Sequence, residues 1–281
     1  YLVLLLKNIL YFCAQNVIIQ NMRRSISFTI LFFMMLSVLV SCYQSHKREL
    51  DLAYTLAESK PDSALAFLNR INQGKLSDKD MAKYALTYYM AQDKSGLDVD
   101  NDSLIRIAYD WYGEHQDDSL YASSLYYMGK YFLLNDSMEQ AKACLEKSYS
   151  ISDSLHNMNL KCLALDKLIE VEEQLAPYKA LNYAKALVKM YDSMPNVCIY
   201  NKVAAHLRLG ENFFYVDSLK QALNEEKKAY SLAMSVGEKG LLSYVSQDLA
   251  SVYEEMGKKD SCLLYARRAY DLNGTNRFSC L

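Results

Sequence analysis

A small or apolar residue recurs along this chain at an almost constant interval. The recurring positions are Ala64, Leu104, Ala141, Ala180, Ala222 and Cys262, and the intervals between them are 40, 37, 39, 42 and 40 residues. A near-fixed period of this length is the signature of stacked copies of one supersecondary unit, in which each copy contacts only its neighbours. The sequence therefore predicts a solenoid rather than a single globular core.

The composition indicates that the repeated unit is helical. The chain has 281 residues, of which 51% are hydrophobic and 23% charged, and it contains only nine glycines and three prolines. So few turn-forming residues argue against an all-β fold, and apolar residues at helical spacing, such as Leu125, Met128 and Phe132, favour amphipathic helices. We expect an all-α fold, an α-α superhelix of about six helical hairpins over residues 48–272.

Asp-Ser dipeptides mark the starts of many predicted helices. They lie at 62–63, 102–103, 118–119, 136–137, 153–154, 192–193, 217–218 and 260–261, and five of the eight are expected to open the second helix of a hairpin. An Asp or Ser side chain before an apolar run accepts a hydrogen bond from the unpaired N–H groups of a helix start. We therefore expect these dipeptides to be helix N-caps.

The hairpins resemble the tetratricopeptide repeat. The matching residues in the fifth unit are Leu209, Gly210, Phe213, Ala222 and Ala229; those in the sixth are Leu249, Ala250, Tyr253, Cys262 and Ala269. Small residues at these positions let the two helices approach closely while the aromatic ring fills the space beside them. The period near 40 exceeds the roughly 34 residues typical of the family, and Leu168 stands where Gly is usual, so a generic helical-hairpin solenoid remains the alternative.

The N-terminal region has the pattern of an export signal. Met22-Arg23-Arg24 precedes an apolar run that ends in Leu39-Val40-Ser41-Cys42, which resembles a bacterial lipobox. The pattern predicts an upstream extension over 1–21, a signal peptide over 22–41, lipidation at Cys42, an anchor linker over 42–47 and a C-terminal tail over 273–281. An uncleaved signal anchor, or a plain signal peptide with an incidental cysteine, is the alternative.

The predicted anchor implies a place in the cell envelope. Tyr43 follows Cys42, where many lipoproteins retained at the inner membrane have Asp, so we expect an outer-membrane lipoprotein that faces the periplasm. Together, the lipobox and the repeats look like the exported repeat lipoproteins of Bacteroidetes.

The sequence contains none of the common motifs for catalysis or metal binding. Four histidines lie in separate units, and the sequence has no Gly-x-Ser-x-Gly, phosphate-binding glycine loop or His-Glu-x-x-His. The net charge of −2 provides no basic field for nucleic acid. Most cysteines are expected to be buried helix residues, with Cys280 as the exception. We predict no enzymatic activity, cofactor, metal or small-molecule substrate.

The resemblance implies a protein-interaction scaffold. In tetratricopeptide repeats the first helices form a groove that binds a protein or peptide partner. Transfer of the family's groove positions gives Tyr126, Lys130, Leu133, Glu172, Glu211, Phe214, Tyr244, Gln247, Ser251 and Glu254. The alternative is the sensor half of a signalling regulator that also has transmembrane and helix-turn-helix parts, and the reading frame beyond Leu281 would distinguish the two.

The Asp-Ser dipeptides have a second interpretation. Followed by a small or apolar residue, they resemble the acceptor motif of the general O-glycosylation system of Bacteroidetes. The candidate acceptors are Ser63, Ser103, Ser119, Ser137, Ser154, Ser193 and Ser218.

Overall fold

The computed structural model describes residues 47–97, 102–115 and 117–273. The predicted signal peptide, Cys42 and most of the C-terminal tail lie outside these residues. The chain divides into two compact units, Tyr1–Leu97 and Asp98–Leu281, each described separately below. The boundary falls inside the second predicted hairpin.

The first unit is helical. Residues 47–56 form a helix, followed by α2 (Pro61–Leu68), a 3₁₀ turn (Gln73–Lys75) and α3 (Asp78–Lys94). Pro61 occupies the first turn of α2, where the missing N–H costs nothing, and the Ser77 hydroxyl accepts a hydrogen bond from the Asp80 N–H at the start of α3. Ala64 and Leu68 are fully buried on the face of α2 that packs toward α3.

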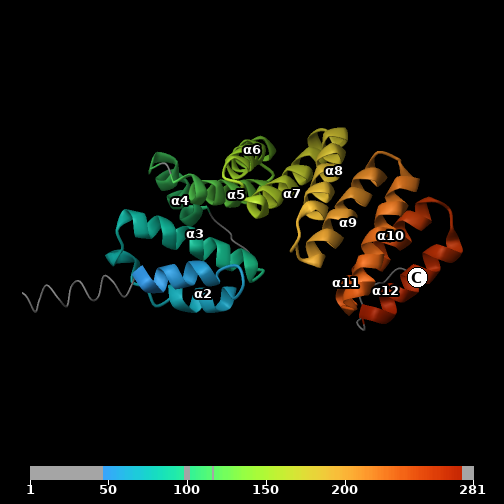
Figure 1. The fold of residues 1–281 in the computed structure, drawn as a ribbon, viewed down its shortest axis with the longest axis horizontal. Helices are drawn as coiled ribbons and strands as arrows, with labels where there is room; N and C mark the ends of the chain where they lie inside the picture. Colours follow the sequence, from blue (N-terminus) through green and yellow to red (C-terminus); the bar gives the residue numbers. More distant parts are fainter. Residues whose placement is uncertain (1–46, 98–101, 116, 274–281) are drawn as a thin grey trace, which may run out of the picture. The chain divides into compact units, whose positions relative to one another are not determined.

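The second unit is a run of antiparallel helices (Figure 1). Its helices are α4 (Ser103–His115), α5 (Asp118–Leu134), α6 (Met138–Ser154), α7 (Met158–Leu175), α8 (Pro177–Ser193), α9 (Ile199–Tyr215), α10 (Leu219–Val236), α11 (Lys239–Glu255) and α12 (Lys259–Asn273). The described residues contain no β-strand. The structure confirms the predicted all-α solenoid of helical hairpins.

Packing in the second unit is sequential. Each second helix, α6, α8 and α10, packs against the first helix of its own hairpin and that of the next. The first helices also contact one another, α5 with α7 and α9 with α11. We call the exposed side of α5, α7, α9 and α11 the first-helix face.

Close helix packing explains the recurring small residues. Ala141, Ala180 and Ala222 are completely buried. In the third hairpin Gly129 lies against Leu145, and a Cβ on Gly129 would come within 2.7 Å of the Leu145 Cγ. Only glycine permits this approach, which is why the third and fifth units keep it.

The Asp-Ser dipeptides lie at the starts of five second helices, as expected, but they do not act there as predicted. Five of them open the second helices α2, α4, α6, α10 and α12. However, neither Ser137 nor Ser218 makes a side-chain cap hydrogen bond. Instead Asp136 and Asp217 have φ of 55° and 57°, and the following N–H groups reach back to Phe132 O and Phe213 O. This is the left-handed turn that closes the preceding helix, so the capping prediction was wrong for these two. It was also wrong for the dipeptides at 153–154 and 192–193, which end α6 and α8, and for those at 62–63 and 118–119, because the N-caps of α2 and α5 are Lys60 and Asp117.

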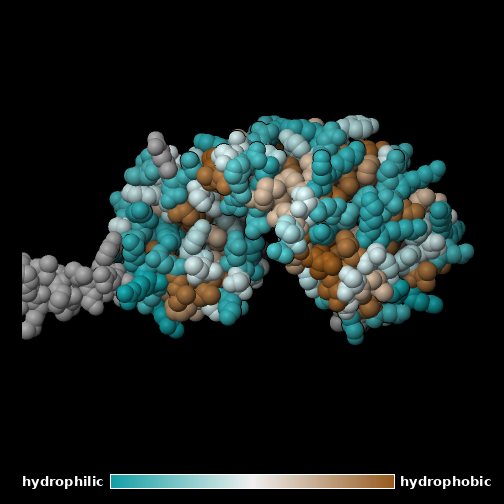
Figure 2. Space-filling model, in the orientation of Figure 1, coloured by the Kyte–Doolittle hydropathy of each residue, from teal (hydrophilic) through white to brown (hydrophobic). Residues whose placement is uncertain are grey.

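On the face shown in Figure 2 most of the coloured surface is hydrophilic, with apolar residues gathered in patches. No helix in the described part of the chain is both long and apolar enough to cross a membrane. Cys144 and Cys162 are buried, as expected, whereas Cys198 is exposed at the start of α9. Burial raises the pKa of the Cys162 thiol to about 11, so this cysteine is an inert core residue.

Candidate functional site

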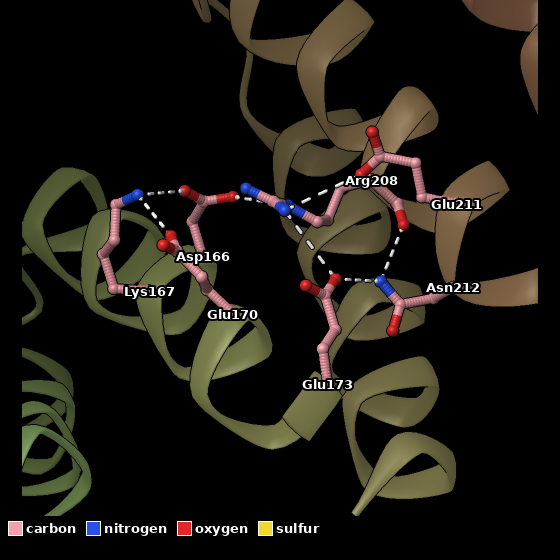
Figure 3. A network of polar contacts seen from close by, with 7 residues as sticks. All are labelled: Asp166, Lys167, Glu170, Glu173, Arg208, Glu211 and Asn212. Atoms are coloured by element: carbon pink, nitrogen blue, oxygen red, sulfur yellow. Dashed lines mark hydrogen bonds and ion pairs between the residues drawn. The ribbon is translucent and has the colours of Figure 1, made fainter. Parts of the chain in front are cut away.

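A polar network joins α7 to α9 on the first-helix face (Figure 3). At its centre the Arg208 guanidinium makes ion pairs with Asp166 at 3.6 Å, Glu173 at 3.7 Å and Glu211 at 3.6 Å. Asp166 and Glu173 lie on α7, while Arg208 and Glu211 are one turn apart on α9. One cation therefore holds three carboxylates.

Asn212 fixes the position of one of these carboxylates. Its amide Nδ2 donates to Glu173 Oε1 at 2.7 Å and to the Arg208 carbonyl oxygen at 2.8 Å (Figure 3). Lys167 on α7 pairs with Glu170 at 2.7 Å and with Asp166 at 4.0 Å. The network is thus ordered by bonds within and between the two helices.

The charge balance of the network is negative. Within the described part of the chain, Asp166, Glu170, Glu173 and Glu211 make their ion pairs with Lys167 and Arg208 alone. Burial and the neighbouring carboxylates raise the pKa of Glu211, while Arg208 opposes this rise. The pKa of Glu173 is likewise raised, mainly by burial. This network therefore has more carboxylates than cations.

The acidic surface continues onto α11. Burial, and then the Glu211 carboxylate, raise the pKa of Asp248 to about 7. Tyr244, one turn before Asp248, is exposed, and the charges that act on its hydroxyl include Asp248, Glu211 and Arg208. Asp248 and Glu211 therefore belong to one group that spans α9 and α11.

Glu226 on α10 lies beneath this group. It is only 1% exposed, and its Oε1 is so close to Gly210 that a Cβ there would clash with it. Burial, and then Asp248, Glu211 and Glu225, raise the pKa of Glu226 to about 9. The buried oxygens Glu226 Oε2 and Asp248 Oδ2 have no hydrogen-bond partner. We call Glu211, Glu226 and Asp248 the acidic cluster.

The structure separates the groove residues predicted from sequence into two sets. Glu211 and Phe214 are partly exposed on α9, Lys130 is partly exposed on α5, and an exposed stripe runs along α11. That stripe consists of Tyr244, Gln247, Ser251 and Glu254. Tyr126, Leu133 and Glu172, by contrast, are buried. Their side chains pack inside the solenoid.

Glu172 shows why a charged residue is found in the interior. Its Oε1 accepts from Lys179 of α8 at 2.6 Å and lies 2.9 Å from Lys142 Nζ of α6. Burial raises the pKa of Glu172, but the two lysines lower it by more. The net pKa is below the usual value, so the carboxylate stays charged. Glu172 therefore joins three helices instead of facing a partner.

The candidate glycosylation sites are all at least partly accessible. Ser63, Ser103, Ser119, Ser154 and Ser193 are exposed, and Ser137 and Ser218 are partly buried. Ser154 and Ser193 are the last residues of α6 and α8. Glycosylation of these residues stays a prediction.

The described residues contain no group of three or more His, Cys, Asp or Glu arranged to hold a metal ion. The buried His206 lies 2.8 Å from Glu225, which also pairs with Lys228 at 2.7 Å.

The sequence alone did not point to five residues of this site, which are Asp166, Glu173, Arg208, Glu226 and Asp248. One of them, Glu226, could have been found from the repeat register, because other units have apolar residues at its position.

Comparison with known proteins identifies the fold. No family model matches the chain, and no curated protein matches it. Among solved structures, it is similar to the apo form of RapI, with 13% identity over 83% of this chain and 67% of that one, and a TM-score of 0.68. It is also similar to a Rap protein complexed with Competence and Sporulation Factor, with 11% identity, 82% and 77% coverage, and a TM-score of 0.55.

A third similar structure contains the nearly identical TPR-like repeats of a kinesin light chain-like protein from Podosopora anserina. The identity is 10%, the coverage is 70% of this chain and 93% of that one, and the TM-score is 0.55. At such low identity the likeness concerns the fold alone. The chain has the fold of a tetratricopeptide-like repeat solenoid.

Proposed function

We propose that this protein is a membrane-anchored scaffold that binds a segment of another protein on the first-helix face of α7, α9 and α11. The observation that carries the proposal is the network in which Arg208 holds Asp166, Glu173 and Glu211 in place across two hairpins. Side chains fixed by their neighbours lose little entropy when a partner binds. The face is therefore preorganised for polar recognition.

The exposed residues of α11 extend this surface. Tyr244, Gln247, Ser251 and Glu254 form a stripe with helical spacing. Tyr244, which is 51% exposed, adds apolar area beside the charges. Tyrosine is enriched at protein interfaces. The solenoid fold favours this use, since stacked repeats present extended binding surfaces. The Rap protein complexed with Competence and Sporulation Factor gives a precedent for binding by a solenoid of this fold.

Site-specific photocrosslinking in native cells would test the proposed face. A photoreactive amino acid at Gln247 or Ser251 is expected to yield a discrete adduct with one protein. The matched control places the same amino acid at Lys227, which is exposed on the second helix α10. Equal adducts at Lys227 and Gln247, or none at either, would contradict the proposal.

A charge variant makes the test specific to the network. Glu211→Lys places a second cation beside Arg208, so we expect it to abolish the Gln247 adduct. Lys227→Glu reverses a charge away from the face and should leave the adduct intact. If both variants crosslink like the parent, the network takes no part in binding.

We further propose that Cys42 anchors the protein to the outer membrane, facing the periplasm. Support comes from the sequence Leu39-Val40-Ser41-Cys42 at the end of an apolar run. Several acyl chains on one cysteine hold a protein stably, because each buried methylene contributes about 0.8 kcal/mol. Cells fed labelled palmitate should label the parent but not Cys42→Ala. Labelling of both would refute the anchor.

A further inference from the structure

The fifth hairpin buries a carboxyl group where other hairpins bury hydrocarbon. Glu226 lies four residues after Ala222. The residues four after the other aligned positions include Leu68, Ala108, Leu145 and Ala184, and each of them is completely buried. Leu145 lies against Gly129 in the third hairpin just as Glu226 lies against Gly210 in the fifth. The same packing position thus holds an apolar group in one unit and an acid in the other.

This acid lacks the partners that a purely structural role would require. A buried polar group without a hydrogen bond costs about 1–3 kcal/mol, so such groups are nearly always satisfied. Glu226 Oε2 and Asp248 Oδ2 have no partner, and within the described residues neither carboxyl has a cation within ion-pair distance. Glu172 Oε2 also lacks a hydrogen-bond partner, but the Glu172 carboxylate differs in that two lysines pair with its Oε1. The acidic cluster therefore has two unused acceptors.

Among the described residues, the nearby cations already pair with other carboxylates. Arg208 is already shared by Asp166, Glu173 and Glu211, and Lys228 pairs with Glu225. Two aromatic rings lie next to the cluster: the charges of Glu211 act on both Tyr215 of α9 and Tyr244 of α11. Both rings are exposed. Carboxylates beside accessible aromatic faces are the chemistry that recognises an ammonium or guanidinium group.

We propose that Glu211, Glu226 and Asp248 receive a Lys or Arg side chain of the partner segment, an inference that rests on the proposed binding of such a segment to the first-helix face. The cationic head pairs with the Glu211 and Asp248 carboxyls, which are partly exposed, above the buried carboxyl of Glu226. The alkyl stem lies against Tyr244. The cluster thereby selects basic segments over neutral or acidic ones.

Such binding is linked to protons. Asp248, with a pKa raised to about 7, and Glu226, with a pKa raised to about 9, hold protons near neutral pH. The charged and titratable groups around them are Glu211 and Arg208 on α9, Glu225 on α10 and Tyr244 on α11. An incoming cation favours the ionised carboxyls and releases protons. Affinity should therefore rise between about pH 6 and pH 8.

The test uses the full chain in detergent and random peptides displayed on phage. Peptides whose binding is blocked by Glu211→Lys are expected to share a Lys or Arg. Replacing that residue by norleucine or citrulline should weaken binding by about tenfold or more, as for close charge pairs. Calorimetry in two buffers of different ionisation enthalpy should detect proton release with the basic peptide only.

Isosteric variants locate the contact. Asp248→Asn and Glu226→Gln should each weaken the basic peptide by about tenfold but leave the norleucine peptide within about twofold. Glu139→Gln, an exposed change on α6, is the matched control and should leave both peptides unaffected. Circular dichroism confirms that each variant is folded. Since both substitutions keep the side-chain shape, a merely structural role would weaken the two peptides equally.

Two outcomes would overturn the inference, and they differ. If peptides bind the first-helix face without a basic residue, or their basic residue shows no coupling to Asp248 and Glu226, the acidic cluster is not the contact, while the proposed function stands. If no peptide sensitive to Glu211→Lys is recovered, the proposed function fails together with the inference.

Discussion

The Glu226 carboxyl lies against the bare backbone of Gly210, in the place where the third hairpin packs Leu145 against Gly129. The two hairpins share a backbone arrangement and differ in what fills it. Replacing Glu226 by leucine would therefore measure how much stability the acid costs the fifth hairpin.

Replacing Glu226 by leucine should stabilise the protein. Leucine reproduces the Gly129–Leu145 packing and removes a buried, unpartnered carboxyl, so we expect the free energy of unfolding at neutral pH to rise by about 1–3 kcal/mol. Urea unfolding followed by circular dichroism measures this change. Glu225→Leu is the control and should destabilise, because it removes the partner of His206 and Lys228. A loss of stability in Glu226→Leu would show that the carboxyl is satisfied.

The stability should fall as the pH rises from about 5 to 9. In this range the folded chain holds protons on Glu226, whose pKa is about 9, and up to about pH 7 on Asp248, whereas the unfolded chain has lost them. Because the folded state binds more protons, the free energy of unfolding decreases with pH, by at most about 1.4 kcal/mol per pH unit for each group. Glu226→Gln should flatten the dependence above pH 7. An unchanged slope would contradict the assignment.

Glycine at Asp217 should stabilise the turn between α9 and α10. Asp217 has a φ of 57°, which favours glycine, and the equivalent turn between α11 and α12 has Gly257 with a φ of 69°. We expect Asp217→Gly to raise the midpoint of thermal unfolding, corresponding to about 0.5–1 kcal/mol. Asp192→Gly, inside α8, should have the opposite effect, since glycine weakens a helix. A lower midpoint for Asp217→Gly would indicate that the Asp side chain itself matters.

Removing Arg208 should destabilise the second unit. Arg208→Ala leaves Asp166, Glu173 and Glu211 without their shared cation, and we expect a loss of about 2–4 kcal/mol. Added salt should recover part of the loss by screening the carboxylates. Arg268→Ala on α12, where the arginine is exposed, serves as the control. Equal losses in both variants would argue against the network.

Glycosylation is tested by mass. If Ser63, Ser103 and the other acceptors are modified, the native protein should exceed the mass of the lipidated polypeptide by whole glycan units. The excess should fall when exposed acceptors are changed to alanine. A mass accounted for by the polypeptide and its lipid would exclude the modification.

The repeat register predicted most of the fold. The nearly constant period and small residues such as Ala141 and Ala222 predicted where the hairpins lie, because helices can approach closely only over small side chains. The turns were harder to predict, because an Asp before a Ser is equally compatible with an N-cap and with a left-handed turn. Backbone geometry at Asp136 and Asp217 decided between them.

The candidate site was less accessible from sequence. Groove positions transferred by resemblance included Glu172, whose burial depends on Lys142 and Lys179 from two other helices. Arg208 and Asp166 pair although they are 42 residues apart along the chain, so no local pattern reveals this contact. Glu226, by contrast, was visible in principle, since aligned units place Leu145 or Ala184 at its position.

The ion pairs from Arg208 to α7 also affect how the fourth and fifth hairpins unfold. In a solenoid, stability is approximately the sum of the intrinsic term of each repeat and a coupling term between neighbours. Arg208 and Asn212 contribute to the coupling between the fourth and fifth hairpins through Asp166 and Glu173. Backbone amides in α7 and α9 should therefore lose hydrogen-exchange protection in one cooperative opening.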